Sequence, residues 1–330
     1  MALRAGLIGL GMMGRHHARV LGSLDGVELV AVADPAGDPH GVAGGRPLHA
    51  SIEGLISEGI DYCMVAVPTA YHEQVGLALA EAGVHAIIEK PLAPDVAAAT
   101  RLADAFAARA LIGAVGHIER YNPALQSLRT RLENGDLGAV YQVATRRQGP
   151  FPARIADVGV VKDLATHDID LTAWVTQQPY TSIMARTAYK SGREHEDLVS
   201  ITGQLADGTV TSHLVNWLSP MKERLTVVTG EKGTFLADTL TADLTFYANG
   251  TVDTEWDAIA KFRGVSEGDV VRYALAKPEP LRVEHECFRD AVLGLPGADL
   301  TIVTMHQGLA TVAVAEAAIT SARDGIVVTL

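Results

Sequence analysis

The chain has 330 residues, of which 48% are hydrophobic and 20% are charged, so we expect two folded domains with sizeable cores rather than a disordered chain. Its formal net charge of -12 argues against a protein that binds nucleic acid without sequence preference, because such proteins need a basic surface. Cys63 and Cys287 are the only cysteines and lack metal-ligand spacing, which argues against a disulfide scaffold and a cysteine-based zinc site.

The N-terminus runs directly into a strand pattern at residues 3–8, without the basic segment and long apolar core that mark a secretory leader. No stretch of the sequence approaches the roughly 18 uncharged apolar residues of a membrane-spanning helix. We therefore expect a cytoplasmic protein whose partners include neither a membrane nor a nucleic acid.

The first 120 residues alternate between short apolar runs and longer segments with helical periodicity. Such alternation predicts βαβ units, and hence an α/β domain with a doubly wound parallel sheet. One helix is expected from Tyr71 to Ala82, where Gly83 ends it, and another from the capping residue Asp95 to Arg109. The expected strands are Leu3–Ile8, Leu29–Ala33, Tyr62–Val67, Ala86–Ile88 and Leu111–Val115.

After about residue 137, strand-like runs are joined by hairpin signals at Asp207-Gly208, at residues 231–233 and at Asn249-Gly250. This pattern predicts an α+β domain with an open, mainly antiparallel sheet. Helices are expected at about 164–176, 283–293 and 302–323, and a last strand at 326–329.

We place the domain boundary after residue 118, which assigns residues 119–330 to the second domain and leaves helix 302–323 as a segment that can pack back on the first. An open sheet face is commonly buried by association between subunits. We therefore expect a homodimer or homotetramer, with the second domain responsible for oligomerisation.

A glycine-rich turn follows the first expected strand and opens a helical segment. Gly9, Gly11 and Gly14 form G-x-G-x-x-G there, with Met12 and Met13 between them, and Asp34 ends the second strand 20 residues past Gly14. In a dinucleotide site, the glycines allow the turn and the approach of the pyrophosphate, and the carboxylate binds the adenosine ribose. The alternative is a tight strand–helix turn with a capping aspartate.

The same Asp34 bears on the choice of cofactor. Its carboxylate would repel a 2′-phosphate, and the next residue is Pro35 rather than an arginine. We therefore predict that residues 1–118 form a domain that binds NAD, with NADP less favoured.

Four segments, in order, resemble the glucose–fructose oxidoreductase, inositol dehydrogenase and MocA-like family. They are Val67-Pro68-Thr69 with Tyr71-His72, Glu89-Lys90-Pro91, Arg120-Tyr121-Asn122-Pro123, and the G-x-x-x-D-x-x-x-H segment from Gly159 to His167. The resemblance implies that Pro68, Thr69, His72, Glu89 and Lys90 lie at the nicotinamide, and that Lys90, Asp163 and His167 are catalytic.

The longer strings 116–123 and 163–170 are similar to the UDP-N-acetylglucosamine 3-dehydrogenase branch, in which Phe is usual at the position of Tyr121. This resemblance implies an NAD-dependent enzyme that oxidises the secondary hydroxyl of a sugar or nucleotide sugar. The rivals are a glycosidase of the same family that recycles NAD, an inositol or sugar ketoreductase, and a non-catalytic NAD-binding sensor.

Oxidation of an alcohol needs a base for the hydroxyl proton, because the cofactor takes only the hydride. Lys90 follows a buried strand at its carboxyl end, where ligands of α/β sheets bind; alternatively, it is a surface lysine that opens a loop. Asp163 and His167 are four residues apart on an expected helix and so share a face. The alternative for this pair is a capping aspartate and a buried core histidine.

Polar residues near the second-domain motifs are the candidate substrate contacts. Glu119 and Arg120 suit sugar hydroxyls or a diphosphate, or alternatively an ion pair between domains, and Tyr121 and Asn122 follow them directly. Arg146, Arg147 and Arg154 form a basic patch that a diphosphate or a solvated loop would explain. Asp168 and Asp170 beside His167 look like metal ligands but do not converge, so no metal is expected.

Overall fold

The computed structural model describes residues 2–151, 158–250 and 267–330. The chain forms two compact units, which are described separately. The first unit comprises Met1–Ile118 and Pro278–Glu316, and the second comprises Glu119–Lys277 and Ala317–Leu330. Residues 278–316 thus group with the first unit, and they include the start of the helix 302–323 that we left able to pack back on the first domain.

The first unit is built on a six-stranded parallel sheet in the order β3-β2-β1-β4-β5-β6. This order, with its reversal beside β1, is that of a doubly wound dinucleotide-binding fold, and it confirms the predicted fold class. The strands are β1 (Leu3–Ile8), β2 (Val27–Ala33), β3 (Leu48–His49), β4 (Tyr62–Val65), β5 (His85–Glu89) and β6 (Gly113–Gly116).

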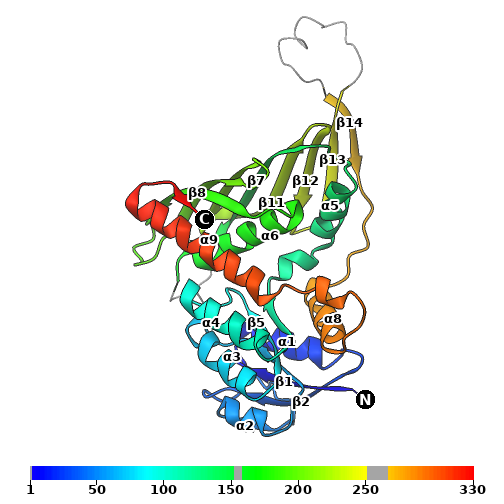
Figure 1. Ribbon diagram of the computed structural model, residues 1–330, viewed down its shortest axis with the longest axis vertical. Helices are drawn as coiled ribbons and strands as arrows, with labels where there is room; N and C mark the ends of the chain where they lie inside the picture. Colours follow the sequence, from blue (N-terminus) through cyan, green and yellow to red (C-terminus); the bar gives the residue numbers. More distant parts are fainter. Residues whose placement is uncertain (1, 152–157, 251–266) are drawn as a thin grey trace, which may run out of the picture. The chain divides into compact units, whose positions relative to one another are not determined.

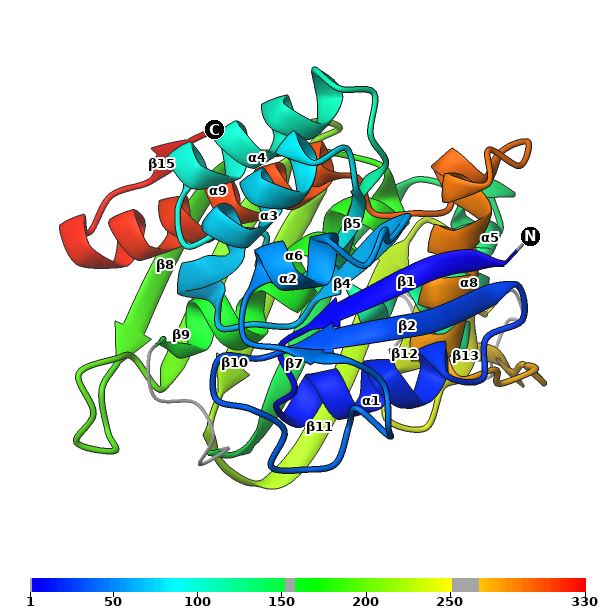
Figure 2. The same ribbon diagram turned by 90° about the horizontal axis from the view of Figure 1, so that it is seen from below.

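Helices cover both faces of this sheet, as Figure 2 shows. On one face lie α1 (Met12–Leu21) and α8 (Pro280–Val292), and on the other lie α2 (Ile52–Ile56), α3 (His72–Glu81) and α4 (Val96–Ala107). Asp95 caps α4 as predicted, because its side chain accepts a hydrogen bond from the Ala98 amide at 2.8 Å.

Apolar packing explains why residues 278–316 return to the first unit. Phe288 and Ala291 of α8 and Ile302 fill a core with Leu7 and Met64 of the central strands. The other face of the sheet buries Val303, Met305 and Val312 against α3 and α4. The segment also contains the 3-10 turn Ala298–Leu300 and the start of α9 (Met305–Asp324), within which the two units divide.

The second unit is built on a nine-stranded mixed sheet in the order β14-β13-β12-β11-β7-β10-β9-β8-β15. All neighbours are antiparallel except β7 and β10, which confirms a mainly antiparallel sheet. The strands are β7 (Val140–Pro150), β8 (Tyr180–Ala188), β9 (Leu198–Leu205), β10 (Val210–Asn216), β11 (Leu218–Gly230), β12 (Gly233–Asp238), β13 (Asp243–Asn249), β14 (Glu267–Arg272) and β15 (Val328–Thr329).

Two helices, α5 (Pro123–Glu133) and α6 (Thr166–Thr176), lie on one face of this sheet, which we call the helix-covered face (Figure 1). Leu125 and Leu171 of these helices pack against Val143 and Phe235 of the sheet. The opposite face, here the open face, exposes Met184 and Leu214, which are 40% and 37% accessible.

One expected hairpin is wrong. β13 ends at Asn249, but its partner strand β14 begins at Glu267, and these two residues are paired in register. Asn249-Gly250 is therefore not a tight two-residue turn. The hairpins at Asp207-Gly208 and at residues 231–233 do join paired antiparallel strands.

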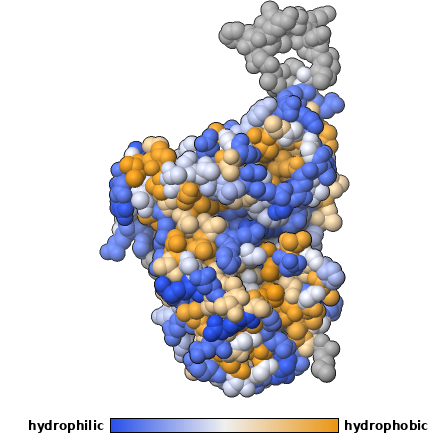
Figure 3. All heavy atoms as spheres, viewed as in Figure 1, coloured by the Kyte–Doolittle hydropathy of each residue, from blue (hydrophilic) through white to orange (hydrophobic). Residues whose placement is uncertain are grey.

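Figure 3 shows hydrophilic and hydrophobic residues interspersed over the face of the molecule that it presents. Across the residues whose structure is described, no helix combines the length and the apolar character needed to cross a membrane.

Candidate functional site

The three glycines of the turn after β1 differ in how much space surrounds them. Gly9 has φ +91°, and a Cβ atom there would lie 2.5 Å from the Ala66 carbonyl group. A Cβ at Gly14 would lie 1.9 Å from the Gly9 carbonyl oxygen. A Cβ at Gly11 would meet no atom of the described residues within 4 Å. Gly9 and Gly14 are therefore needed for the fold itself, whereas Gly11 leaves a cradle in front of helix α1.

That cradle suits a phosphate group. Gly11 is the N-cap of α1, and no side chain of the described residues caps the helix, so its first amides are available to a ligand. Met12 is 50% exposed and Met13 is half-buried at this end of the helix. Uncapped amides together with the helix dipole favour an anion, so the residues present fit the pyrophosphate of NAD.

Asp34 is fixed beside the same turn. Its Oδ2 accepts a hydrogen bond from the Leu10 amide and its Oδ1 accepts one from the Ala36 amide, both at 2.8 Å. Each carboxylate oxygen keeps a further lone pair that can accept a hydrogen bond from a ribose hydroxyl. The contact of Asp34 with the adenosine ribose stays a prediction, and the position of the carboxylate beside the glycine turn fits it.

His72 connects the turns that follow β4 and β5. Its Nε2 lies 3.0 Å from the Val67 carbonyl oxygen, and its Nδ1 lies 2.9 Å from the Pro91 carbonyl oxygen. Burial lowers the pKa of this imidazole. A neutral ring has one N–H and donates to one of these two carbonyl oxygens. His72 thus lies between the turn after β4 and the Lys90–Pro91 turn, and its contact with the cofactor stays a prediction.

Glu89 belongs to a buried chain of hydrogen bonds. Its Oε1 lies 2.8 Å from Nε2 of His17, and Nδ1 of His17 lies 2.8 Å from Nε2 of His285. Burial alone would raise the pKa of Glu89, but the hydrogen bond and charge of His17, with the charge of Lys90, hold it below its ordinary value. The carboxylate also accepts a hydrogen bond from the Lys90 amide at 3.1 Å. Glu89 thus anchors the segment that carries Lys90, which is itself half-buried.

A second buried carboxyl lies on α8 beside this chain. In the described part of the chain, neither side-chain oxygen of Glu284 has a hydrogen-bond partner. Burial, and then the nearby charge of Glu89, raise the pKa of Glu284 well above its ordinary value. Burial thus favours the neutral carboxylic acid form of Glu284. The sequence singled out neither Glu284 nor the roles of His17 and His285.

In the second unit, Asp163 lies in a π-helical turn, Val161–Ala165, that leads into α6. The expected helix start at Leu164 therefore lies inside this π-helical turn, and the α-helix begins at Thr166. Such turns are frequent at functional sites. Glu196 holds this turn: its Oε1 accepts a hydrogen bond from the Val161 amide at 3.1 Å, and its carbonyl oxygen accepts one from the Val160 amide at 3.0 Å. Asp163 is 6% exposed, and His167 is half-buried.

Two arginines neutralise the acidic residues that resembled metal ligands. Arg120 contacts both carboxylate oxygens of Asp170, at 2.9 and 2.7 Å. Arg147 contacts Asp168 and Glu119, each at 2.7 Å. Glu119 and Arg120 therefore form ion pairs within the second unit. Among the described residues, no three His, Cys, Asp or Glu side chains are arranged to hold a metal ion.

Burial works against the charge of Arg147, yet the carboxylates of Asp168 and Glu119 more than offset it and raise the pKa of this guanidinium. The side chain is 3% exposed, so all three groups are largely withdrawn from water. This buried cluster of ion pairs lies next to the segment that carries Asp163 and His167.

Tyr121 is buried, and the Asn122 side chain makes hydrogen bonds at the start of α5. Tyr121 is 4% exposed. Asn122 caps α5 by accepting a hydrogen bond from the Ala124 amide at 3.0 Å, and its amide group donates to the Thr239 carbonyl oxygen at 3.0 Å. Their side chains are therefore engaged at the start of α5, as the Asn-Pro sequence of a helix N-terminus would require.

Arg146 points to the other side of the sheet. It is paired in register with Leu214, which is exposed on the open face, and it contacts Glu223 at 2.9 Å. Its neighbour Arg147 faces the helix-covered face, where α6 carries Asp168. Arg146 is therefore separated from Asp163 and His167 by the thickness of the sheet. Arg154 lies outside the described residues.

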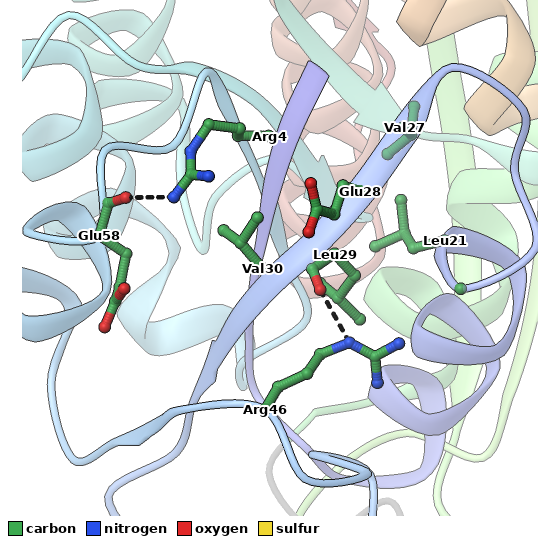
Figure 4. A pocket seen from close by; sticks show the side chains of 9 residues that line it. Arg4, Leu21, Val27, Glu28, Leu29, Val30, Arg46 and Glu58 are labelled. Atoms are coloured by element: carbon green, nitrogen blue, oxygen red, sulfur yellow. Dashed lines mark hydrogen bonds between the residues drawn. The ribbon is translucent and has the colours of Figure 1, made fainter. Parts of the chain in front are cut away.

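A separate surface pocket of about 470 Å³ lies at the amino ends of β1 and β2 (Figure 4). Its arginines are engaged: Arg46 donates to the Leu29 carbonyl oxygen and Arg4 donates to the Glu58 carbonyl oxygen, both at 2.7 Å. Ligands of open parallel sheets bind beyond the carboxyl ends of the strands. This pocket is therefore not the dinucleotide site.

Two family models match the chain. Residues 3–163 match an oxidoreductase family with an NAD-binding Rossmann fold, and residues 125–236 match the GFO/IDH/MocA C-terminal domain. Together the two models extend over residues 3–236.

Among curated proteins, the chain is 32% identical to a UDP-N-acetylglucosamine 3-dehydrogenase of Acidithiobacillus ferrooxidans, over 64% of this chain and 66% of that protein. It is 30% identical to inositol 2-dehydrogenase 2 of Saccharopolyspora erythraea, over 60% of each protein. The matched stretches thus span less than two thirds of the length of these relatives.

Solved structures agree in fold over nearly the whole chain. The Acidithiobacillus ferrooxidans UDP-N-acetylglucosamine 3-dehydrogenase superposes with a TM-score of 0.82 at 26% identity, over 98% of this chain and 99% of that one. The WlbA dehydrogenase of Bordetella pertussis, solved with NADH and UDP-GlcNAcA, superposes with a TM-score of 0.80 at 23% identity, over 100% and 99% of the two chains. The second likeness concerns the fold alone.

Proposed function

Because the chain belongs to the Gfo/Idh/MocA oxidoreductase family, we propose that it is an NAD-dependent dehydrogenase acting on a secondary hydroxyl of a sugar or nucleotide sugar. The observation that carries this proposal is the open cradle at Gly11, with uncapped amides behind it and the Asp34 carboxylate beside it. When bound there, NAD supplies the hydride acceptor, and the chain's own residues bind the substrate and accept the hydroxyl proton.

The substrate that we favour is a nucleotide sugar oxidised at its 3-hydroxyl. In support, the relative at 32% identity is named a UDP-N-acetylglucosamine 3-dehydrogenase. Several other relatives, at 28–30% identity, are named inositol 2-dehydrogenases, so an inositol is the second candidate. Incubating the protein with NAD and a panel of nucleotide sugars, free sugars and inositols, and following NADH, tests both.

We assign proton transfer to Lys90 in the first unit and to the Asp163–His167 pair in the second. Lys90 follows β5 directly, and the Glu89–His17 hydrogen bond fixes the backbone that carries it. Asp163 is buried at a π-helical turn four residues before the half-buried His167. A carboxylate near a histidine sets its charge and tautomer, which suits a group that moves protons.

Two other functions are separated from this one by a single experiment. A dehydrogenase forms one NADH per ketone produced, whereas a glycosidase that recycles NAD releases a cleaved sugar with no net NADH. A sensor does neither while still binding NAD. Following the reduced-nicotinamide absorbance and sugar release in one reaction distinguishes the three. Release of sugar without NADH would replace the dehydrogenase with the glycosidase.

The open face of the nine-stranded sheet supports self-association. Met184, Val210, Leu214 and Tyr247 are exposed apolar side chains on it, between 37% and 45% accessible. Strand pairing in register places all four on the same face as Arg146. We propose that a second copy of the chain covers this face, so that light scattering at micromolar concentration gives a dimer or tetramer. A monomer would contradict this assignment.

A further inference from the structure

Arg224 occupies a position that the sequence patterns did not single out. It lies on β11 directly opposite Arg147 of β7, in an antiparallel pair. Side chains opposite each other in such a pair point to the same face of the sheet. Arg224 therefore points to the helix-covered face, as Arg147 does, and it is half-buried there.

The two arginines differ in how their charge is used. Arg147 is held between Asp168 and Glu119 at 2.7 Å each. Over the residues that the structure describes, the Arg224 guanidinium makes one long hydrogen bond, 3.4 Å from Nη1 to the Glu223 carbonyl oxygen, and no ion pair within 4.0 Å. A guanidinium has five N–H donors, so most of this capacity is unused.

The charge of Arg224 is retained and lies within reach of the acidic residues of the site. Burial, and then the charge of Arg147, lower the pKa of Arg224 to about 10, so it stays protonated at pH 7. The carboxylates of Glu119, Asp168 and Asp163 act in the opposite direction on the same group. Arg224 is therefore electrostatically coupled to Asp163 without being bonded to it.

A half-buried cation is unfavourable unless a partner compensates for its lost hydration. The nearest carboxylates, Asp168 and Glu119, are already bonded to Arg147. A planar guanidinium with free donors matches the oxygens of a phosphate or a carboxylate, which it contacts through two parallel hydrogen bonds. An anionic group of a ligand would supply such a partner.

We propose that Arg224 binds an anionic substituent of the substrate, a diphosphate or a carboxylate, next to the Asp163–His167 segment. The inference deepens the proposed function and rests on it for the word substrate, but the binding of the anion does not depend on turnover. It assigns the recognition of charge to Arg224 rather than to Arg146, which lies on the open face of the sheet.

The test uses two probes with the full chain and saturating NAD: UDP for the diphosphate and glucuronate for the carboxylate. Calorimetry should give saturable binding of at least one probe, and Arg224→Gln should weaken it by about 10-fold or more. Whichever probe depends on Arg224 identifies the anion. Arg272→Gln is the charge-matched control, because Arg272 is 69% exposed on the edge strand β14.

Arg224→Lys keeps the charge and loses the planar fork, so its affinity should lie between those of the wild type and Arg224→Gln. Unchanged thermal unfolding of both variants shows that the fold is intact. Wild-type affinity in Arg224→Gln, or no binding of either probe to the wild type, would overturn the proposal.

The anion site and the dehydrogenase activity can be disproved independently of each other. If Arg224 is needed for probe binding and no sugar or inositol in the panel yields NADH, the anion site stands and the dehydrogenase does not. If a neutral inositol yields NADH and neither probe binds, the dehydrogenase stands and the anion site is wrong. If a nucleotide sugar yields NADH, Arg224→Gln should raise its KM by at least 10-fold while changing kcat less.

Discussion

His17 and His285 share a hydrogen bond of 2.8 Å between Nδ1 of the first ring and Nε2 of the second, and both rings are fully buried. Since Glu89 is ionised and accepts from Nε2 of His17, this nitrogen carries a proton. The bond between the rings then holds one further proton, on one ring or the other. Three elements, β5, α1 and α8, are thus joined through one polar chain inside an apolar core.

Replacing His17 should leave the Glu89 carboxylate buried without its main partner. His17→Leu is expected to lower the free energy of unfolding by about 3–5 kcal/mol at pH 7, the cost of leaving a buried carboxylate without its hydrogen-bond partner. Urea unfolding measures it, and His16→Leu is the control because His16 is exposed on the same helix.

The effect should also depend on pH. The pKa of Glu89 is lowered in the fold, so its stabilisation is present above the ordinary carboxyl pKa and is lost as the pH falls through the lowered value. In His17→Leu the carboxyl no longer gains this stabilisation. The difference between variant and wild type should therefore shrink from pH 7 to pH 3. A difference that is the same at both pH values would show that His17 acts only by filling space.

Glu284 should destabilise the protein as the pH rises. Its pKa is raised in the fold, so its contribution is fully present below the ordinary carboxyl pKa and is lost as the pH rises toward the raised value. Glu284→Gln should remove this pH dependence, so the variant should be more stable than the wild type at pH 8. The expected gain in the free energy of unfolding is about 1.4 kcal/mol for each tenfold increase, on folding, in the affinity of the Glu284 carboxylate for its proton. Glu286→Gln, whose wild-type side chain pairs with Arg282, is the control. Parallel stability curves for Glu284→Gln and wild type would refute a raised pKa of Glu284.

Gly11 and Gly14 should separate cofactor binding from folding. Gly11→Val should abolish NAD binding in calorimetry and leave thermal unfolding nearly unchanged, because a Cβ there would meet none of the described atoms within 4 Å. Gly14→Ala should lower the unfolding temperature, because its Cβ would lie 1.9 Å from the Gly9 carbonyl oxygen. Retained NAD affinity in Gly11→Val would place the pyrophosphate elsewhere.

Removing either proposed proton-transfer group should slow turnover without weakening the binding of the cofactor. Lys90→Ala and His167→Ala should each reduce kcat by about 10²–10⁴-fold, while calorimetry gives unchanged NAD affinity. The double variant should lose less than the product of the two, since groups that act as one unit are not additive. Lys232→Ala, in the turn between β11 and β12, serves as the control. Near-normal turnover in both single variants would transfer the role of base to Tyr121 or Glu119.

The first unit was predictable from its sequence because its signals are local. Alternating apolar and helical segments define the parallel sheet, and the glycine spacing with Asp34 defines the cofactor turn. The position of α8 was not predictable in this way. Its apolar face indicates burial but does not indicate which core receives it, and Phe288 packs with Leu7 far away in the chain.

The sequence predicted which types of residue form the candidate site, but it predicted less well which of them contact each other. Arg146 and Arg147 are equivalent as sequence, but the alternation of a strand sends them to opposite faces, and only the register shows which one meets Asp168. Arg224 becomes apparent only once β11 is paired with β7. The π-helical turn around Asp163 has no sequence signal of its own.

The return of residues 278–316 to the first unit has a consequence for synthesis on the ribosome. Phe288 completes the core around Tyr62, with ring centroids 5.4 Å apart, yet it is translated after almost the entire second unit. When residues 1–118 emerge, one face of their parallel sheet still lacks its covering helix α8. The nascent first unit therefore exposes apolar surface, to which chaperones can bind, until the C-terminal segment is made.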